Sequence, residues 1–254
     1  MLIVSVRDLH IRLGFHEILN YPESSMSKPL TDWKMEIDDA PIFCYLYRNF
    51  QPKRHLEFGT LQGTGVLYCL EECEATVWTI NLLEGEKKTD GSHIYSNNFM
   101  FYEYLPPWSK NLPFWLKKKI YGEDKIMGYQ ADSHSSIGKY YLEKGLGSRV
   151  CQIYCDSREW DISNYPEGFF DTVLIDGGHS EDVVMNDTIK AFKLLRSGGL
   201  IMWHDFCLTE EVYSQCPSTQ GVINTIQENW EWISSQVKDI FWVKPSWILL
   251  GIKK

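Results

Sequence analysis

The chain has 254 residues, which is enough for one α/β domain with a buried core and a small addition. A hydrophobic content of 44% and an aromatic content of 14% exclude a disordered or coiled-coil chain. The formal net charge of −9 argues against a broad surface for nucleic acid or anionic membranes, so we expect a small molecule or a neutral glycan as partner.

The cysteines and the N-terminus indicate the cellular setting. Seven cysteines form an odd set without a Cys-x-x-Cys pair, which favours buried, reduced thiols over a disulfide framework or a metal cluster. The first residues lack the basic start and long apolar centre of a signal peptide, and no apolar run reaches the length of a membrane span. We predict a soluble, cytoplasmic protein. Its oligomeric state stays open, and a homodimer is compatible with the sequence.

The N-terminal part carries mixed signals. Residues 2–13 are β-branched and partly alternating, which favours a strand, although residues 9–19 fit a helix equally well. Serine and proline over residues 22–29 indicate a loop. We predict an N-terminal extension or cap over residues 1–37, followed by the main domain over residues 38–254.

The main domain begins with a helix and then alternates strands with helices. Asp38 and Asp39 look like an N-cap for a helix through Ile42 and Phe50, with Pro41 in its first turn. Strands are predicted over residues 55–58, 76–82, 149–154, 172–176 and 200–203, and a helix over 181–195 that stops at the Ser-Gly-Gly of 197–199. This alternation predicts a parallel sheet with helices on both faces.

Two segments depart from the alternation. Near the C-terminus, strands over residues 239–243 and 247–252 are joined by a Lys-Pro-Ser turn, which is too short for a parallel crossover, so they must be antiparallel. Between the second and third strands lies an aromatic insertion over about residues 93–130, which fits either a packed subdomain or a lid over a pocket. Its lysines 117–119 fit a solvated face better than a contact with membrane or phosphate.

Residues 55–70 contain the most specific motif. A short apolar run ends in Glu57, and Gly59, Gly63 and Gly65 precede an apolar helical pattern, which predicts a strand, a tight turn and a helix N-terminus. Glycines let the backbone approach a ligand, and the N–H groups of a helix start favour polar or anionic atoms. The dinucleotide fingerprint spaces its glycines two and then three apart, whereas these are four and then two apart, which argues against a nicotinamide or flavin cofactor.

With an acid two residues before its first glycine, this motif resembles the first motif of class I S-adenosylmethionine-dependent methyltransferases. The resemblance implies a Rossmann-like, doubly wound α/β fold, with a mostly parallel seven-stranded sheet closed by the antiparallel C-terminal hairpin. It also implies that Glu57 faces the methionine end of S-adenosylmethionine, while Gly59, Thr60, Gly63 and Gly65 make room for this cofactor.

Two further strand ends carry residues that the resemblance assigns to the cofactor. Asn81 stands where the family usually has an acid that binds both ribose hydroxyls, and an amide can still bond a hydroxyl. Asp156 and Ser157 resemble the pair at the adenine edge. Ordinary turn chemistry is the alternative for these positions, because Asp and Ser favour turns in any case.

The ends of the fourth and fifth strands resemble paired motifs of a subgroup that includes sugar and natural-product O-methyltransferases. Ile-Asp-Gly-Gly-His contains Asp176 and His179, and Trp-His-Asp contains His204 and Asp205. In metal-dependent O-methyltransferases three ligands from these strand ends hold a divalent cation, which points to Asp176, His204 and Asp205 as ligands of Mg²⁺. A histidine among them suits Mn²⁺ or Zn²⁺ better. The alternative is that the two aspartates bond backbone amides or the cofactor.

His179 is the best candidate for a general base, with Asp176 as the second catalytic residue. An ordinary histidine pKa near ~6.5 allows it to take a hydroxyl proton at neutral pH, and a neighbouring carboxylate would tune that pKa. The alternative, equally compatible with the sequence, is a histidine that caps the helix starting near Ser180. The other histidines have no motif around them.

The resemblance as a whole implies an enzyme that moves the methyl group of S-adenosylmethionine to an acceptor hydroxyl of a small molecule or sugar, with or without a divalent cation. The alternative is a non-catalytic, S-adenosylmethionine-binding or accessory module of a larger glycan-processing protein. Formation of product from candidate acceptors separates these two functions. A nicotinamide oxidoreductase fails on the glycine spacing and on the terminal hairpin.

Overall fold

The computed structural model of the chain describes residues 1–83 and 137–254. The aromatic insertion predicted over residues 93–130, including lysines 117–119 and His93, lies outside the described residues, and so does His134. Among the described residues, no helix combines the length and the apolar character needed to cross a bilayer.

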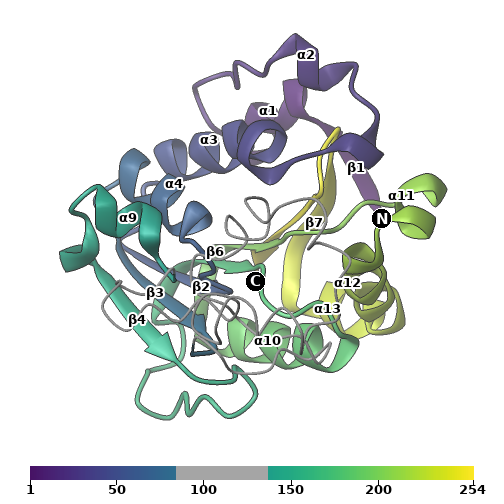
Figure 1. Cartoon of the computed structure of the whole chain (residues 1–254). Helices are drawn as coiled ribbons and strands as arrows, with labels where there is room; N and C mark the ends of the chain where they lie inside the picture. The colour runs from purple at the N-terminus through teal and green to yellow at the C-terminus, as the bar shows by residue number, and fades with distance from the viewer. Residues whose placement is uncertain (84–136) are drawn as a thin grey trace, which may run out of the picture.

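One sheet of eight strands forms the centre of the described structure, in the order β1-β7-β8-β6-β5-β2-β3-β4 (Figure 1). The strands are β1 (Leu2–Ser5), β2 (Arg54–Phe58), β3 (Thr76–Asn81), β4 (Val150–Tyr154), β5 (Phe170–Ile175), β6 (Leu195–Trp203), β7 (Val237–Lys244) and β8 (Ile248–Lys253). All neighbours are parallel except β8, which runs antiparallel to both β6 and β7. The predicted doubly wound, mostly parallel sheet with an antiparallel C-terminal hairpin is confirmed.

The sheet has one strand more than the predicted seven, because the N-terminal segment joins it. β1 pairs in parallel with the outer edge of β7, from Leu2 opposite Phe241 to Ser5 opposite Lys244. After Ser5 the chain forms a 3₁₀ turn and then helix α1 (Leu9–Leu13), so only the first part of the strand predicted over residues 2–13 is present. The boundary between cap and main domain at residue 37 stays a prediction.

Helices pack on both faces of the sheet (Figure 1). α3 (Ala40–Phe50) and α4 (Thr64–Glu72) lie on one face, and α10 (Glu181–Leu194) lies on the other with α12 (Pro217–Glu228) packed against it. The shorter helices are α2 (Glu23–Met26), α9 (Lys139–Glu143), α11 (Glu210–Gln215) and α13 (Trp230–Gln236). The predicted Ser-Gly-Gly stop at 197–199 lies inside β6, because α10 already ends at Leu194 and β6 begins directly after it.

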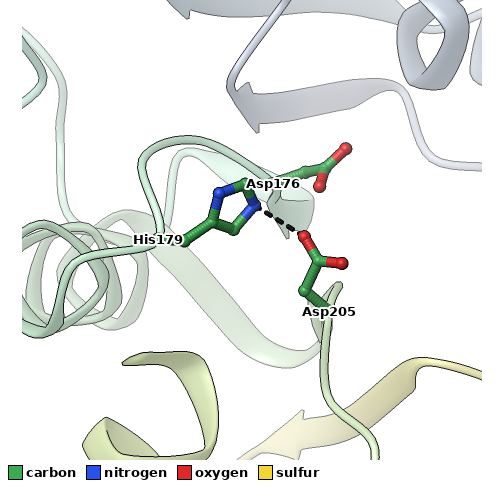
Figure 2. Close-up of side chains that lie close together, drawn as sticks. All are labelled: Asp176, His179 and Asp205. Atoms are coloured by element: carbon green, nitrogen blue, oxygen red, sulfur yellow. Dashed lines mark ion pairs between the residues drawn. The ribbon is translucent and has the colours of Figure 1, made fainter. Parts of the chain in front are cut away.

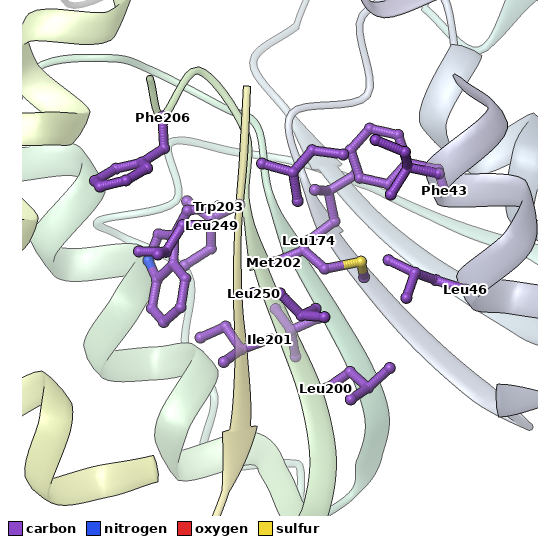
Figure 3. Packing of buried hydrophobic residues seen from close by; sticks show 14 of the residues in the cluster. Phe43, Leu46, Leu174, Leu200, Ile201, Met202, Trp203, Phe206, Leu249 and Leu250 are labelled. Carbon is purple, nitrogen blue, oxygen red and sulfur yellow. The ribbon is translucent and has the colours of Figure 1, made fainter. Parts of the chain in front are cut away.

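Alternate residues of β6 pack against helices on opposite faces (Figure 3). Leu200 and Met202 point toward the side that carries Phe43 of α3. Trp203 points the other way, and its indole N–H donates a hydrogen bond of 2.9 Å to the hydroxyl of Thr188 in α10. Successive side chains of a strand point to opposite faces, so a strand buried on both sides is apolar throughout. This packing fixes the strand whose carboxyl end carries the Trp-His-Asp motif.

A π-helical turn, Met35–Asp39, precedes α3 and changes the role expected for two aspartates. Asp39 stands directly before α3, but its side chain makes no capping hydrogen bond. Asp38 accepts a hydrogen bond of 2.7 Å from the hydroxyl of Ser25 and one of 2.9 Å from the backbone N–H of Lys34. The predicted capping role is wrong because both carboxylates are occupied elsewhere. Asp38 ties the turn to the short helix α2 (Glu23–Met26), which lies in the segment predicted to be a loop, and Asp39 reaches the carboxyl edge of the sheet.

Candidate active site

The predicted site residues lie at the carboxyl ends of neighbouring parallel strands. β2, β5 and β6 are adjacent, and their pairing continues past the strand ends. The backbone N–H of Asp176 donates to the carbonyl of Phe58 at 2.9 Å, and that of His204 donates to the carbonyl of Ile175 at 3.0 Å. Because open α/β sheets bind their ligands at this edge, the residues after these strands form the candidate active site.

The turn after β2 approaches the neighbouring strand end so closely that only glycine fits. Gly59 and Gly63 have φ angles of 96° and 84°, in the left-handed region that favours glycine. A Cβ atom at Gly59 would lie 2.0 Å from the carbonyl oxygen of Asp176. At Gly63 it would lie 2.7 Å from the ring of Tyr141. The glycine turn is therefore in contact with the end of β5 and with the segment that precedes β4.

Glu57 is buried beneath the first turn of α4. Its side chain is 1% exposed, and a Cβ atom at Gly65 would lie 2.8 Å from each of its carboxylate oxygens. One of these, Oε2, has no hydrogen-bond partner among the described residues. Burial, and secondarily the charge of Asp176, raises the pKa of Glu57 well above its ordinary value. Buried polar atoms are normally paired, so this oxygen is an open contact for a donor group on a ligand.

Asn81 and Thr60 make hydrogen bonds inside the protein. The amide oxygen of Asn81 accepts the backbone N–H of Leu61 at 3.0 Å, and its amide nitrogen donates to the carbonyl of Leu82 at 2.8 Å. The hydroxyl of Thr60 is bonded to that of Thr79 at 2.7 Å. These bonds hold the glycine turn against the end of β3. Direct contact of Asn81 or Thr60 with a cofactor stays a prediction.

Asp156 and Ser157 follow β4 at the same edge of the sheet. The carboxylate of Asp156 pairs with the guanidinium of Arg158 at 2.6 Å and accepts its backbone N–H at 2.9 Å. The side-chain hydrogen bond from Arg158 lowers the pKa of Asp156 in spite of partial burial. The carbonyl of Ser157 accepts a hydrogen bond from Lys190. These contacts are compatible with the turn-chemistry alternative, and the adenine-edge role stays a prediction.

His204 is buried between two aspartates from distant parts of the sequence. Its Nδ1 lies 3.0 Å from Oδ1 of Asp176, and its Nε2 lies 3.1 Å from Oδ2 of Asp39. An ionised carboxylate only accepts hydrogen bonds, so a ring nitrogen that faces one is the donor, and with both carboxylates ionised the ring is an imidazolium. Burial raises the pKa of Asp39 above its ordinary value, against the hydrogen bond and the charge of His204, which lower it. Burial would lower the pKa of His204, but the charges of Asp176 and Asp205 outweigh it and raise this pKa well above the ordinary value.

His179 and Asp205 face each other across the candidate site (Figure 2). Nε2 of His179 lies 2.6 Å from Oδ2 of Asp205, in an ion pair whose N–H direction is not aligned as a hydrogen bond. The side chain of His179 is 39% exposed, whereas that of Asp205 is 10% exposed. Partial burial would lower the pKa of His179, but the contact with Asp205 outweighs it and raises this pKa above the ordinary value.

Within residues 1–83 and 137–254, the ligand atoms that converge well enough to hold a metal ion belong to Asp176, His179 and Asp205, and they lie within 4.8 Å of one another (Figure 2). The predicted set had His204 in place of His179. Both ring nitrogens of His204 are engaged by carboxylates, so a cation bound through His204 would require breaking one of these hydrogen bonds. The geometry thus favours His179 as the imidazole of any metal site, and the metal itself stays a proposal.

Helix α12 places both members of the His179 and Asp205 pair. Asp205 has a φ of 57°, a left-handed conformation that aspartate tolerates, and its Oδ1 accepts a hydrogen bond of 3.4 Å from the hydroxyl of Ser218. A Cβ atom at Gly221 would lie 1.9 Å from the carbonyl oxygen of His179. The helix therefore rests directly on the turn that carries His179.

Sequence reasoning missed two contributors to the site. Asp39 was predicted to be a helix cap, and an Asp-Asp pair before a proline-containing helix carries no signal of a contact with His204. Gly221 lies within an ordinary helical pattern, and its close contact with His179 arises only from the packing of α12. Both contacts join residues that are far apart in the sequence.

A family model described as a methyltransferase domain matches residues 56–206, which is more than half of the chain. The fold and the arrangement of strand ends define a class I methyltransferase. The chain belongs to this methyltransferase-domain family, which confirms the class predicted from the glycine turn. Asp39 lies outside the matched residues. A search of curated proteins found no match.

Solved structures with the same fold include several methyltransferases of low sequence identity. The Podospora anserina methyltransferase PaMTH1, bound to SAH, is 16% identical with a TM-score of 0.51, covering 92% of this chain and 83% of that chain. A Bacillus cereus O-methyltransferase in complex with SAH is also 16% identical with a TM-score of 0.51, covering 98% and 90%. A putative caffeoyl-CoA O-methyltransferase from Staphylococcus aureus is 12% identical with a TM-score of 0.50, covering 98% and 90%. At these identities the likeness concerns the fold.

Proposed function

We propose that the protein transfers the methyl group of S-adenosylmethionine to a hydroxyl group of a small molecule or sugar. The observation that carries the proposal is the glycine turn, where Gly59 and Gly63 bring bare backbone to the sheet edge near the buried Glu57. Oε2 of Glu57 has no hydrogen-bond partner among the described residues and lies 3.7 Å from Nε2 of His55. This oxygen fits the ammonium group of the methionine end, which is a hydrogen-bond donor. Two methyltransferases of the same fold that hold SAH support this methyl donor.

The residues around His179 fit the acceptor side of such a reaction. S-adenosylmethionine supplies an electrophilic methyl group on a sulfonium, and an acceptor oxygen must be held near ~3 Å from that carbon to attack in line. His179 is partly exposed, and its Nε2 is paired with Asp205, so its Nδ1 is the nitrogen that takes the proton of the acceptor hydroxyl. The imidazolium formed is stabilised by the carboxylates of Asp205 and Asp176.

A divalent cation is a further proposal for the same residues. Two carboxylates and one imidazole from Asp176, Asp205 and His179 suit Mn²⁺ or Mg²⁺, and a bound cation would lower the pKa of an acceptor hydroxyl. Calorimetric titration with Mn²⁺ tests this set without any acceptor. We expect Asp205→Asn to abolish binding and Asp38→Asn to retain it, since the Asp38 carboxylate bonds to Ser25 and Lys34. Absence of saturable Mn²⁺ binding by the unmodified chain would exclude the cation.

The methyl-donor proposal is tested by calorimetry with S-adenosylmethionine and S-adenosylhomocysteine. We expect saturable binding by the unmodified chain, loss of binding in Gly59→Ala, and full binding in Gly14→Ala, where nothing lies within 4 Å of the added Cβ. No binding by the unmodified chain would contradict the proposal.

Turnover is then measured as release of S-adenosylhomocysteine with panels of sugars, phenols and polyketide hydroxyls. Product formation supports the transferase. Binding of the methyl donor without product from any of these acceptors would favour an accessory module.

A further inference from the structure

We propose that Asp39 is a positioning residue of the methyl-transfer site, which acts through His204 on Asp176. This inference rests on the proposed function and extends it to a residue of the N-terminal segment, outside the matched residues 56–206. The contact concerned is the line of hydrogen bonds from Asp39 through His204 to Asp176, with lengths of 3.1 and 3.0 Å.

The carboxylate of Asp39 is held so that only one oxygen faces His204. The residue is fully buried. Its Oδ1 accepts the indole N–H of Trp33 at 2.7 Å and the backbone N–H of Trp247 at 3.2 Å. Its Oδ2 is left for Nε2 of His204. Two donors from separate parts of the chain therefore hold the carboxylate of Asp39 in place independently of His204.

The fixed carboxylate determines how the ring of His204 lies. With Nε2 held by Asp39, Nδ1 must face Asp176, and a rotation of the ring breaks both hydrogen bonds. Asp176 follows the end of β5, and its backbone carbonyl lies against the glycine turn at Gly59. His204 therefore holds an Asp176 oxygen in place between the methyl-donor side and the His179 side of the site, and Asp39 keeps His204 in that orientation.

The backbone around Asp39 is unusual in the way expected of a functional residue. Asp39 ends the π-helical turn Met35–Asp39. Such turns are rare in proteins, and many of those known lie at functional sites. An N-cap would have placed its carboxylate on the N–H groups of α3, but the carboxylate makes no such bond. The turn thus directs Asp39 into the sheet edge and away from the helix that it precedes.

Asp38 provides a matched control, since it is equally buried and adjacent but bonds away from the site. Its carboxylate accepts from Ser25 and from the backbone of Lys34, and it pairs with Lys28. A substitution at Asp38 therefore disturbs the N-terminal segment without touching His204. Any loss specific to Asp39 beyond that of Asp38 measures the contact with His204.

The experiment compares Asp39→Asn, Asp38→Asn, His204→Asn and the Asp39→Asn/His204→Asn double variant. In Asp39→Asn the amide oxygen can still accept from Trp33 and Trp247, but the amide NH₂ group faces the N–H of His204 and removes the acceptor. Kinetics are measured with S-adenosylmethionine and an acceptor that the unmodified chain methylates. S-adenosylhomocysteine affinity is measured by calorimetry, stability by urea unfolding, and the position of His204 in a crystal structure of Asp39→Asn.

We expect Asp39→Asn to lower kcat at least about tenfold while KM for S-adenosylmethionine stays within about threefold. Asp38→Asn should keep kcat within about twofold, even where it lowers the free energy of unfolding as much as Asp39→Asn does. The double variant should be no slower than His204→Asn alone. An unchanged kcat in Asp39→Asn, or losses that multiply in the double variant, would overturn the positioning role.

The crystal structure separates this inference from the proposed function. If the unmodified chain binds no methyl donor, the proposed function fails. The position of the His204 ring in the crystal structure of Asp39→Asn still tests whether Asp39 positions that ring. A ring displaced from Asp176 supports it, and a ring left in place within hydrogen-bond distance of Asp176 overturns it.

Discussion

Replacing Gly59 with alanine tests the packing on which the methyl-donor site depends. The added Cβ atom would lie 2.0 Å from the carbonyl oxygen of Asp176 and 2.7 Å from Cα of Gly177, while ordinary van der Waals contact begins at 3.4 Å. Both atoms belong to backbone, so the turn after β2 or the end of β5 must move by about 1.4 Å, the difference between 2.0 and 3.4 Å.

The cost has two parts, and a second glycine separates them. A left-handed conformation costs about 1–2 kcal/mol for a residue with a Cβ atom, and overpacking adds about 1–3 kcal/mol. Gly14 has a φ of 69° with nothing within 4 Å of its Cβ position, so Gly14→Ala carries only the first part. We therefore expect a loss of about 2–5 kcal/mol for Gly59→Ala and about 1–2 kcal/mol for Gly14→Ala.

Urea unfolding followed by circular dichroism measures both losses. With a denaturant slope of about 3 kcal/mol per molar, the loss expected for Gly59→Ala lowers the midpoint by about 0.7–1.7 M, whereas that expected for Gly14→Ala lowers it by about 0.3–0.7 M. Calorimetry on the folded variants should show that only Gly59→Ala loses S-adenosylhomocysteine. Equal midpoints for the two variants, or full affinity in Gly59→Ala, would refute the reasoning.

Three further predictions follow from the histidines and from α12. The contact with Asp205 raises the pKa of His179, so kcat/KM should increase as the pH rises through a value above ~6.5. Asp205→Asn should shift this rising part of the pH profile to lower pH, and an unshifted profile would contradict the pairing of His179 with Asp205. Gly221→Ala should lower kcat at least about tenfold by displacing the backbone of His179, with S-adenosylhomocysteine affinity kept; an unchanged kcat would show that α12 does not place the base. The pKa of His204 is raised by folding, so its stabilisation is fully present below ~6.5 and is lost as the pH rises through the raised value. Buried tyrosines and cysteines with raised pKa values lower the stability of both chains in alkaline solution, so urea midpoints should fall more steeply for the unmodified chain than for His204→Gln, and equal slopes would contradict the ion pairs of His204.

The strands and the class of protein were predictable from local patterns. Apolar runs bounded by turn residues predicted strands that match β2 to β5 within two residues and the second half of β6, because a buried parallel strand is apolar on both faces. The Lys-Pro-Ser turn before β8 required an antiparallel pair because of its length alone. The spacing of Gly59, Gly63 and Gly65 excluded a dinucleotide cofactor and indicated the methyl-donor family, because close backbone approach can be met by glycine alone.

Which side chains meet at the site was decided by the tertiary structure. Asp38 and Asp39 look alike in the sequence, yet Asp38 bonds to Ser25 of α2 and Asp39 holds His204, because a π-helical turn directs them to different sides. The sequence put His204 and Asp205 together as metal ligands, whereas the fold turns His204 between two carboxylates and brings His179 to Asp205. Local patterns specify which elements form and where they end. The partners of a polar side chain depend on contacts between distant elements, and these form only when the sheet and its helices are assembled.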